Sequence, residues 1–403
     1  MAFLPLAHLK LLILGIPVYS VELPIIVALL FYLYGWKRGE FALGCTINLN
    51  RTFAASITFF FLGALFSFMA NPVSWTGLGM IKTWFVLPIL AVWLWLKSAP
   101  DDTDFKRLLF IWLAANVFTA LVSLVFFEQG ILTYDGRLAA WYASPNYLAF
   151  FLAPGVLVAS YFISSLSFLR QGLLIVFWLA LAILIGAIFF TGSYATWGSV
   201  FIALAIYFYL GYARSVARRQ KIIFALTLIV LFVTLIFFAS GSEKWQSLMT
   251  LSERSSLASR IMIWRSAVRI ISDQPLWGIG MGRFQEIYLA YQKYFPPYLE
   301  WAVPQPHNLY LAVWLQSGLL GLAGFVVLIS VWLRKMLRLW HLSVQDAYTR
   351  KTSAFLVALM VLFLLLGVAD TPFFKTDSAF IFWLTTALGI GFLNHHEIEK
   401  KTF

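Results

Sequence analysis

The sequence predicts an all-α polytopic membrane protein with about twelve transmembrane helices and one large, partly helical extracytoplasmic loop. Hydrophobic residues make up 62% of the 403 residues and charged residues only 11%. With a mean hydropathy of +0.85, the chain is far too apolar for a soluble globular protein. Apolar runs recur at about the 20 residues that a helix needs to cross roughly 30 Å of hydrocarbon. One long polar interval, residues 241–306, interrupts them.

Twelve apolar segments are predicted as helices on this basis, and we treat residues 1–403 as one integral membrane domain. The segments are 3–19, 20–36, 53–70, 78–97, 108–127, 147–165, 173–191, 195–213, 222–240, 308–333, 353–370 and 378–394. The first two are short and meet near "YSVELP", so they can also be one span plus a re-entrant piece. No small-residue cleavage site follows the first apolar stretch, which favours a retained helix over a signal peptide.

The basic residues predict the orientation. Cys45 is the single cysteine, so one chain cannot build a disulfide framework or a thiolate metal cluster. The net charge of the chain is +12. Most cations lie in short connections between apolar runs, which is typical of loops at an anionic cytoplasmic leaflet and not of nucleic-acid binding. With twelve spans these connections share one side, so we expect both termini to be cytoplasmic and residues 241–306 to lie outside. The cations that set this prediction are Lys37, Arg38, Arg51, Lys106, Arg107, Arg170, Arg214, Arg218, Arg219, Lys221, Arg334, Lys335, Arg338, Arg350, Lys351, Lys400 and Lys401.

The outer interval is predicted to be partly helical. Apolar residues at helical spacing indicate an amphipathic helix over residues 257–272 and a second over 285–294. Pro275 and the glycines at 278, 280 and 282 predict a turn between them. The glycines of "GIGMGRF" do not follow a strand, so we do not interpret them as a dinucleotide-binding loop.

Arginines in the outer interval are candidate ligands for an anion. Arg265 and Arg269 are four residues apart and share a helix face, whereas Arg260 lies about 140° from Arg265 at about 100° per residue. One straight helix therefore cannot direct all three to one point. They can snorkel at lipid headgroups, or one or two can grip a phosphate or pyrophosphate in a bidentate way.

Two further stretches that we expect to lie outside carry polar groups. In "YDGRLAAWYASPNYLA", Arg137 can contact a ligand or simply pair with Asp135, and Asn146 can cap the following helix. In "PQPHNLYL", His307 directly precedes a long apolar helix at the predicted outer boundary. A neutral imidazole can accept a proton near pH 7, since the unperturbed pKa of histidine is about 6.5. A polar anchor at the membrane surface is the simpler interpretation of His307.

No metal or cofactor site is predicted. The sequence has no HExxH motif and no paired histidines near the outer interval, and His395 and His396 fall in the cytoplasmic tail. Asp370 and Asp377 flank the short turn "DTPFFKTDS" and could bind a cation. Because Lys375 lies between them, a structural turn is the favoured interpretation.

Taken in order, these segments resemble the O-antigen ligase and polymerase superfamily, bacterial membrane glycosyltransferases that use undecaprenyl-diphosphate-linked glycans as donors. The matching stretches are "GRLAAWYASPNYLA", "SRIMIW", "PLWGIGMGRF", "PHNLYL" and "DTPF". The resemblance implies that Arg260 engages the diphosphate of the lipid donor and that His307 activates the acceptor hydroxyl, without a metal or cofactor. It implies supporting roles for Asn146, Asn308 and Tyr310.

The chain departs from the family at one turn. Family members commonly carry "TGSR" after the seventh span, and here the turn reads Thr191-Gly192-Ser193-Tyr194. Tyrosine cannot supply a cation, so we expect Arg137 or Arg265 to provide the second diphosphate contact.

The resemblance implies an inverting glycosyltransferase in the plasma (inner) membrane, with a polyprenyl-diphosphate-linked glycan as donor and a glycan, lipid or protein as acceptor. The outer interval 241–306 would carry part of the active site. A ligase is the first expectation, and a repeat-unit polymerase or a protein O-oligosaccharyltransferase is the alternative. A transporter or lipid flippase, which also has about twelve spans, is the alternative from a different class.

Overall fold

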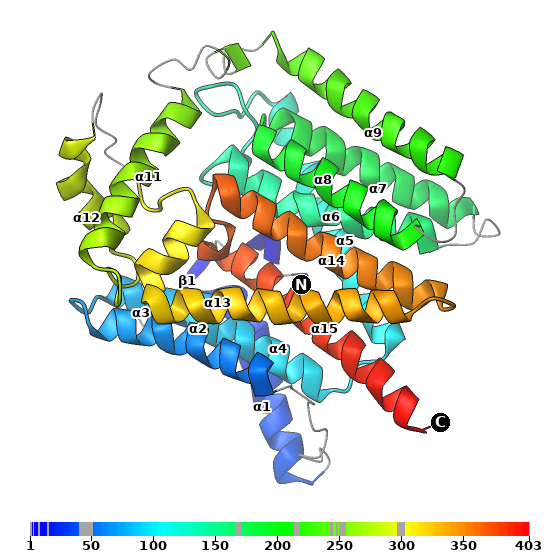
Figure 1. The fold of residues 1–403 in the computed structure, drawn as a ribbon, viewed down its shortest axis with the longest axis horizontal. Coiled ribbons are helices and arrows are strands. Elements are labelled where there is room, and N and C mark those ends of the chain that lie inside the picture. Colours follow the sequence, from blue (N-terminus) through cyan, green and yellow to red (C-terminus); the bar gives the residue numbers. More distant parts are fainter. Residues whose placement is uncertain are drawn as a thin grey trace.

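The computed structural model is a bundle of long helices with a smaller helical segment at one end (Figure 1). It describes residues 2, 4–6, 9–13, 16–39, 51–165, 171–212, 218–241, 245–246, 249, 255–295 and 303–402. In this part of the chain, nine helices are long and apolar enough to cross a membrane. This confirms an all-α polytopic membrane protein.

Eleven of the twelve predicted segments lie on helices. The bundle consists of α2 (Arg51–Met69), α3 (Trp75–Ile81) continued by a π-helical turn η2 (Lys82–Val86) and α4 (Leu87–Lys97), α5 (Asp102–Glu128), α6 (Pro145–Ser165), α7 (Gln171–Phe190), α8 (Tyr194–Tyr212), α9 (Arg218–Ala239), α13 (Leu309–Leu342), α14 (Ala347–Ala369) and α15 (Thr376–Thr402). Residues 255–295 belong to the interval that the sequence predicts to lie outside, and we call them the outer segment. They form α11 (Ser256–Asp273), α12 (Phe284–Tyr291) and the 3-10 turn η4 (Gln292–Tyr294). We call the end of the bundle beside α11 and α12 the α11 end (Figure 1).

The predicted helix over residues 3–19 is wrong. A 3-10 turn η1 (Leu4–Leu6) and an antiparallel hairpin of β1 (Lys10–Ile13) and β2 (Ile16–Tyr19) occupy this stretch. Pro17 lies near the middle of β2, opposite Leu12. A proline there would remove a hydrogen bond of a helix and clash with the preceding turn, whereas an edge strand tolerates it.

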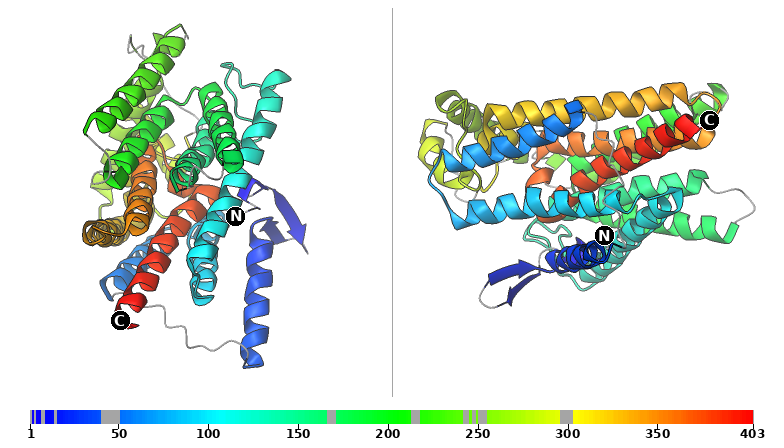
Figure 2. Two further views of the ribbon diagram at one scale, coloured as in Figure 1. Left: turned by 90° about the vertical axis from the view of Figure 1, so that its right-hand side faces the viewer. Right: turned by 90° about the horizontal axis from the view of Figure 1, so that it is seen from below.

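The next helix, α1 (Glu22–Lys37), coincides with the second predicted span but has only 16 residues. It runs steeply across the direction of α13, and Figure 2 shows it nearly end-on from below. The prediction that both termini are cytoplasmic depended on twelve crossings. The hairpin removes one of them, so that parity argument no longer holds.

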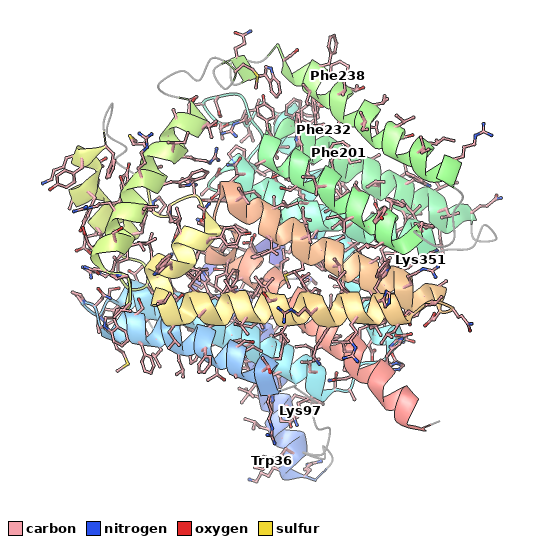
Figure 3. All side chains as sticks on the ribbon, viewed as in Figure 1. Trp36, Lys97, Phe201, Phe232, Phe238 and Lys351 are labelled. Atoms are coloured by element: carbon pink, nitrogen blue, oxygen red, sulfur yellow. The ribbon has the colours of Figure 1, made fainter. Side chains whose placement is uncertain are left out.

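The centre of the bundle is the close contact of α2 with α13. A Cβ added to Gly63 would lie 2.2 Å from the backbone nitrogen of Gly321, and one added to Gly324 would lie 2.4 Å from that of Phe60. Small residues allow such close approach of two backbones, which favours helix association in membranes. α14 packs between α13 and α8, and Phe201 of α8 stacks edge-on against Phe232 of α9 (Figure 3).

A break in α13 holds the outer segment in place. Gly318 has a φ of +66°, and its position next to the main chain of Leu276 leaves no room for a Cβ. The interrupted helix bonds to the outer segment instead, because Leu319 N donates to Leu276 O and Ile279 N donates to Leu315 O. The glycine-rich stretch 278–282 is therefore a docking loop for α13. Its small apolar core with α11 and α12 comprises Ile263, Ala267, Ile270, Ile271, Ile279, Phe284, Tyr288, Val303 and Leu315.

An aromatic cluster anchors the turn between α14 and α15. Phe373 of the 3-10 turn η5 (Pro372–Phe374) is fully buried, and its ring centroid lies 5.3 Å from those of Phe60, Phe85 and Phe382. These contacts fix the position of Asp370 and of the residues that follow it at the α11 end.

Candidate functional site

His307 is held in one orientation by its main chain. It has a φ of +49°, a left-handed conformation that costs a non-glycine residue about 1–3 kcal/mol and persists only where neighbours impose it. Asn308 caps α13, since its Oδ1 accepts from the N–H groups of Tyr310 and Leu311. Trp264 of α11 donates its indole N–H to the carbonyl of His307 at 3.3 Å.

The imidazole of His307 pairs with a carboxylate. Nδ1 lies 3.0 Å from Oδ1 of Asp370, the residue that ends α14. With Asp370 ionised, Nδ1–H donates and the neutral tautomer leaves Nε2 as the acceptor. The His307 side chain is 28% exposed and that of Asp370 only 2%. The described residues offer no hydrogen bond to Nε2, so this nitrogen is accessible to a substrate hydroxyl.

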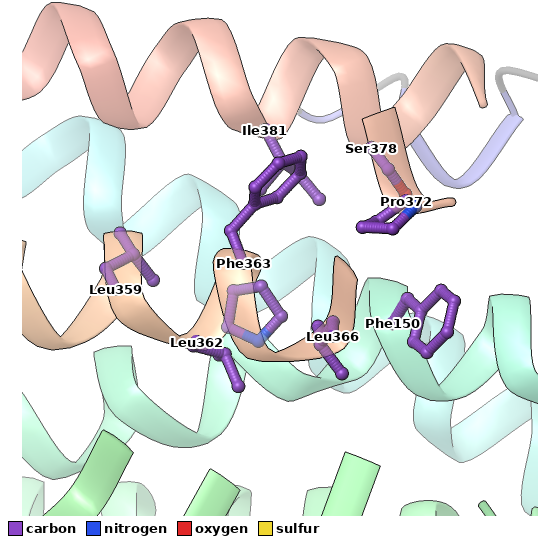
Figure 4. A pocket seen from close by; sticks show the side chains of 9 residues that line it. Phe150, Leu359, Leu362, Phe363, Leu366, Pro372, Ser378 and Ile381 are labelled. Atoms are coloured by element: carbon purple, nitrogen blue, oxygen red, sulfur yellow. The ribbon is translucent and has the colours of Figure 1, made fainter. Parts of the chain in front are cut away.

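Asp370 remains a carboxylate despite its burial. Burial alone would raise its pKa, but the His307 imidazole, the nearby Arg260 and the Thr371 N–H lower the pKa to about 2. Thr371 N lies 2.8 Å from Oδ1. Leu366 and Pro372, which flank Asp370, also line an apolar cavity of about 10 Å³ between α6, α14 and α15 (Figure 4). Residues close to Asp370 in the chain therefore form part of an apolar region of the bundle.

The prediction that Asn146 caps the sixth helix is wrong. The helix begins at Pro145, and the hydroxyl of Ser144 accepts from Asn146 N at 3.3 Å. Ser144 thus takes the capping position because proline, which lacks an N–H, occupies the first helical residue. The amide of Asn146 instead reaches Oδ2 of Asp370 at 3.4 Å. This residue therefore contacts the His307–Asp370 pair, which we call the dyad.

Arg260 lies close enough to the dyad to act on its charge. Its guanidinium lowers the pKa of Asp370, and its own pKa is lowered by burial and by Arg137, with Asp370 opposing. Nη1 donates to Ser256 O at 3.3 Å, whereas the buried Nε–H has no hydrogen-bond partner among the described residues. A desolvated donor of this kind can be satisfied by an anionic ligand.

Arg137 approaches Arg260 from the loop between α5 and α6. Its Nε donates to Oδ2 of Asp135 at 2.5 Å, and its Cδ lies 3.0 Å from where a Cβ on Gly192 would be. Contact with a ligand and pairing with Asp135 are thus both compatible with the position of Arg137. The Asp135 pair orients the side chain, and the turn at residues 191–193 supports it.

Arg265 is not brought into this group. The buried face of α11 carries Met262, Ile263, Ser266, Ala267, Ile270 and Ile271. Arg265 lies on the exposed face, as does Arg269, whose Nε pairs with Asp273 at 3.5 Å. The expectation that Arg265 assists Arg260 is not supported, because the 100° rotation per residue turns the two side chains away from each other.

Asn308 and Tyr310 connect the two helices that carry the dyad. Asn308 Nδ2 donates to Val368 O at 3.1 Å, and Tyr310 OH donates to Leu364 O at 3.0 Å. Both bonds cross from α13 to the last two turns of α14. These bonds hold the start of α13 beside the end of α14.

Sequence reasoning missed the pairing of Asp370 with His307. The signal was present, since two consecutive antiparallel spans place the end of one beside the start of the other. The end of α14 is thus at the same level as the start of α13, which puts "DTPF" next to "PHNLYL". The sequence alone favours a structural turn there, because Lys375 lies between Asp370 and Asp377.

The arrangement combines a proton acceptor with cations at one end of the bundle. Nε2 of His307 can take a proton from a hydroxyl, and the carboxylate of Asp370 stabilises the imidazolium that results. Arg260 and Arg137 can neutralise a phosphate or diphosphate nearby. Such a site suits transfer of a group from a phosphorylated leaving group to a hydroxyl.

A protein-family model described as O-antigen ligase matches residues 179–326 of the chain. The match covers α8, α9, the outer segment with Arg260, and the start of α13 with His307. No curated protein matches the sequence. The family match confirms the resemblance that the order of sequence motifs indicated.

Proposed function

We propose that this chain, a member of the O-antigen ligase and polymerase superfamily, moves a glycan from an undecaprenyl-diphosphate donor to an acceptor hydroxyl. The observation that carries the proposal is the His307–Asp370 pair at 3.0 Å, with Arg260 and Arg137 at the same end of the bundle. A polyprenyl chain would lie in the bilayer while its diphosphate and sugars reach this end.

The reaction is a single displacement at the anomeric carbon. The acceptor oxygen attacks that carbon and its proton passes to Nε2 of His307. The bond between the anomeric carbon and the diphosphate oxygen breaks, and the electron pair leaves with the polyprenyl diphosphate. Arg260 and Arg137 stabilise the negative charge that develops there, and the attack from the opposite side inverts the anomeric configuration.

We propose that the α11 end faces the outside of the plasma membrane and that the site works without a metal ion, because the two guanidinium groups supply the positive charge. Basic residues in the short connections at the other end support this orientation. Arg107 near the start of α5 is one of them, and Lys351 near the start of α14 is another (Figure 3).

The test uses the full-length protein in detergent with a purified lipid-linked donor and a set of candidate acceptors. His307→Ala should abolish transfer and leave the protein folded. His341→Ala is the matched control, since His341 is exposed and lies near the C-terminal end of α13, whereas His307 precedes its N-terminal end. Undiminished transfer by His307→Ala would remove the catalytic assignment.

The same assay identifies the acceptor. A single added glycan indicates a ligase, a ladder of products indicates a polymerase, and a glycosylated protein indicates an oligosaccharyltransferase. Substrate flux into proteoliposomes without any covalent product would favour a transporter or flippase instead.

A further inference from the structure

A lysine beside the dyad is not used by the proposed reaction. Lys375 lies between η5 and α15, and its Nζ is 4.0 Å from the centroid of the Tyr147 ring. Tyr147 follows Asn146, whose amide reaches Asp370. The ammonium of Lys375 therefore lies on the α6 side of the dyad.

This ammonium lacks a direct ion pair. The nearest charges that act on it are Asp370 and Asp377, yet in the described part of the chain no carboxylate lies within 4.0 Å of Nζ and no acceptor forms a hydrogen bond with it. Burial lowers the pKa of Lys375, and the two aspartates only partly oppose this. Each aspartate has backbone donors of its own, from Thr371 and Ser378 at 2.8 Å.

Removing part of a charged ammonium from water is costly for the fold. The ring of Tyr147 offsets part of that cost through its negative face. Nζ of Lys375 is not fully enclosed, so its N–H groups can donate to a ligand, and phosphate oxygens are strong acceptors. The position, burial and missing partners of the lysine thus indicate a ligand of negative charge.

We propose that Lys375 is a third anion-binding group of this site and contacts a phosphate of the donor's diphosphate. This inference rests on the proposed function and extends it. Arg260 comes from α11, Arg137 from the loop before α6, and Lys375 from the turn after α14, so three separate elements supply the cations. A lysine is a compact point charge and complements the planar forks of the two arginines.

The experiment measures binding of inorganic pyrophosphate to the full-length protein in nanodiscs by calorimetry, and the KM for the lipid-linked donor. Lys375→Met should weaken pyrophosphate binding by about tenfold or more and raise the KM, since one charged hydrogen bond is lost. Lys375→Arg should retain most of the affinity.

Lys293→Met is the matched control, because Nζ of Lys293 also lies over a tyrosine ring, 5.1 Å from the centroid of Tyr294, but in the outer segment. The affinity of Lys293→Met for pyrophosphate should equal that of the wild type. Lys375→Gln, which keeps a polar chain of similar reach, replaces the methionine variant if the latter does not fold, and it should show the same loss.

Wild-type affinity in Lys375→Met or Lys375→Gln would overturn the inference, even if the variant melts at a lower temperature, because Lys375 would then only balance the two aspartates. The same result with normal glycan transfer would leave the proposed function intact. A wild type that binds pyrophosphate through Lys375 but transfers no glycan would refute the proposed function and keep the anion site.

Discussion

Replacing Asp370 by asparagine keeps the size of the side chain and removes the charge that lies 3.0 Å from Nδ1 of His307. The pKa of Asp370 falls from 3.8 to about 2 in the folded protein. At about 1.36 kcal/mol for each pKa unit, this shift corresponds to a net stabilisation of the carboxylate on the order of 2 kcal/mol. His307 is the largest contributor among the groups that lower the pKa.

The imidazole becomes positively charged when it accepts the acceptor proton, so the carboxylate acts most strongly in the transition state. If most of this stabilisation is lost there, kcat falls by about 10- to 30-fold. We expect the KM of the lipid-linked donor to change little, because the charge acts on the imidazole and not on the diphosphate.

The assay is single-turnover transfer by purified Asp370→Asn protein across a range of pH. Asp273→Asn is the control, as Asp273 is a more exposed carboxylate of the outer segment that accepts from Tyr291 at 2.8 Å. A wild-type rate for Asp370→Asn, while His307→Ala is inactive, would refute the view that the carboxylate orients and stabilises the imidazole.

Three more predictions concern the ionisation of Asp370, the guanidinium of Arg260 and the break in α13. Because the pKa of Asp370 is depressed in the folded state, the carboxylate stabilises the fold above pH 3.8, and this contribution is lost as the pH falls to about 2. The difference in melting temperature between the wild type and Asp370→Asn should therefore shrink over that pH range. A constant difference would contradict this. Arg260→Lys should lower the rate of glycan transfer by about tenfold or more, because an ammonium lacks the planar fork of a guanidinium. The control Arg265→Lys should match the wild-type rate. Equal rates in both variants would favour a lipid-surface role for Arg260. Gly318→Ala should lower the free energy of unfolding by about 2–4 kcal/mol, since a Cβ would meet a main-chain oxygen at 2.4 Å at a φ of +66°. The control in thermal melting is Gly79→Ala, because the space around Gly79 is open. Equal melting temperatures of the two variants would show that the break in α13 tolerates a side chain.

The sequence determined the class of protein and the identity of the principal chemical groups. The length and spacing of apolar runs are local properties of the chain, so they locate the bundle helices and the helices at 257–272 and 285–294 with little error. Composition alone does not separate a helix from a hairpin over residues 3–19, where an apolar run contains two prolines and β-branched residues. Family motifs pointed to Arg260 and His307 because those stretches are contiguous in the chain.

Only the tertiary structure decided which of these groups meet. Asp370 is 63 residues from His307 and reaches it because α13 and α14 are antiparallel neighbours. Arg265 is five residues from Arg260 but faces away, because a helix turns its side chains by about 100° per residue. Asn146 proved to be a contact of the dyad, since Ser144 took the capping position. Proximity between distant residues depends on how helices pack, and a pattern read along one chain does not contain that information.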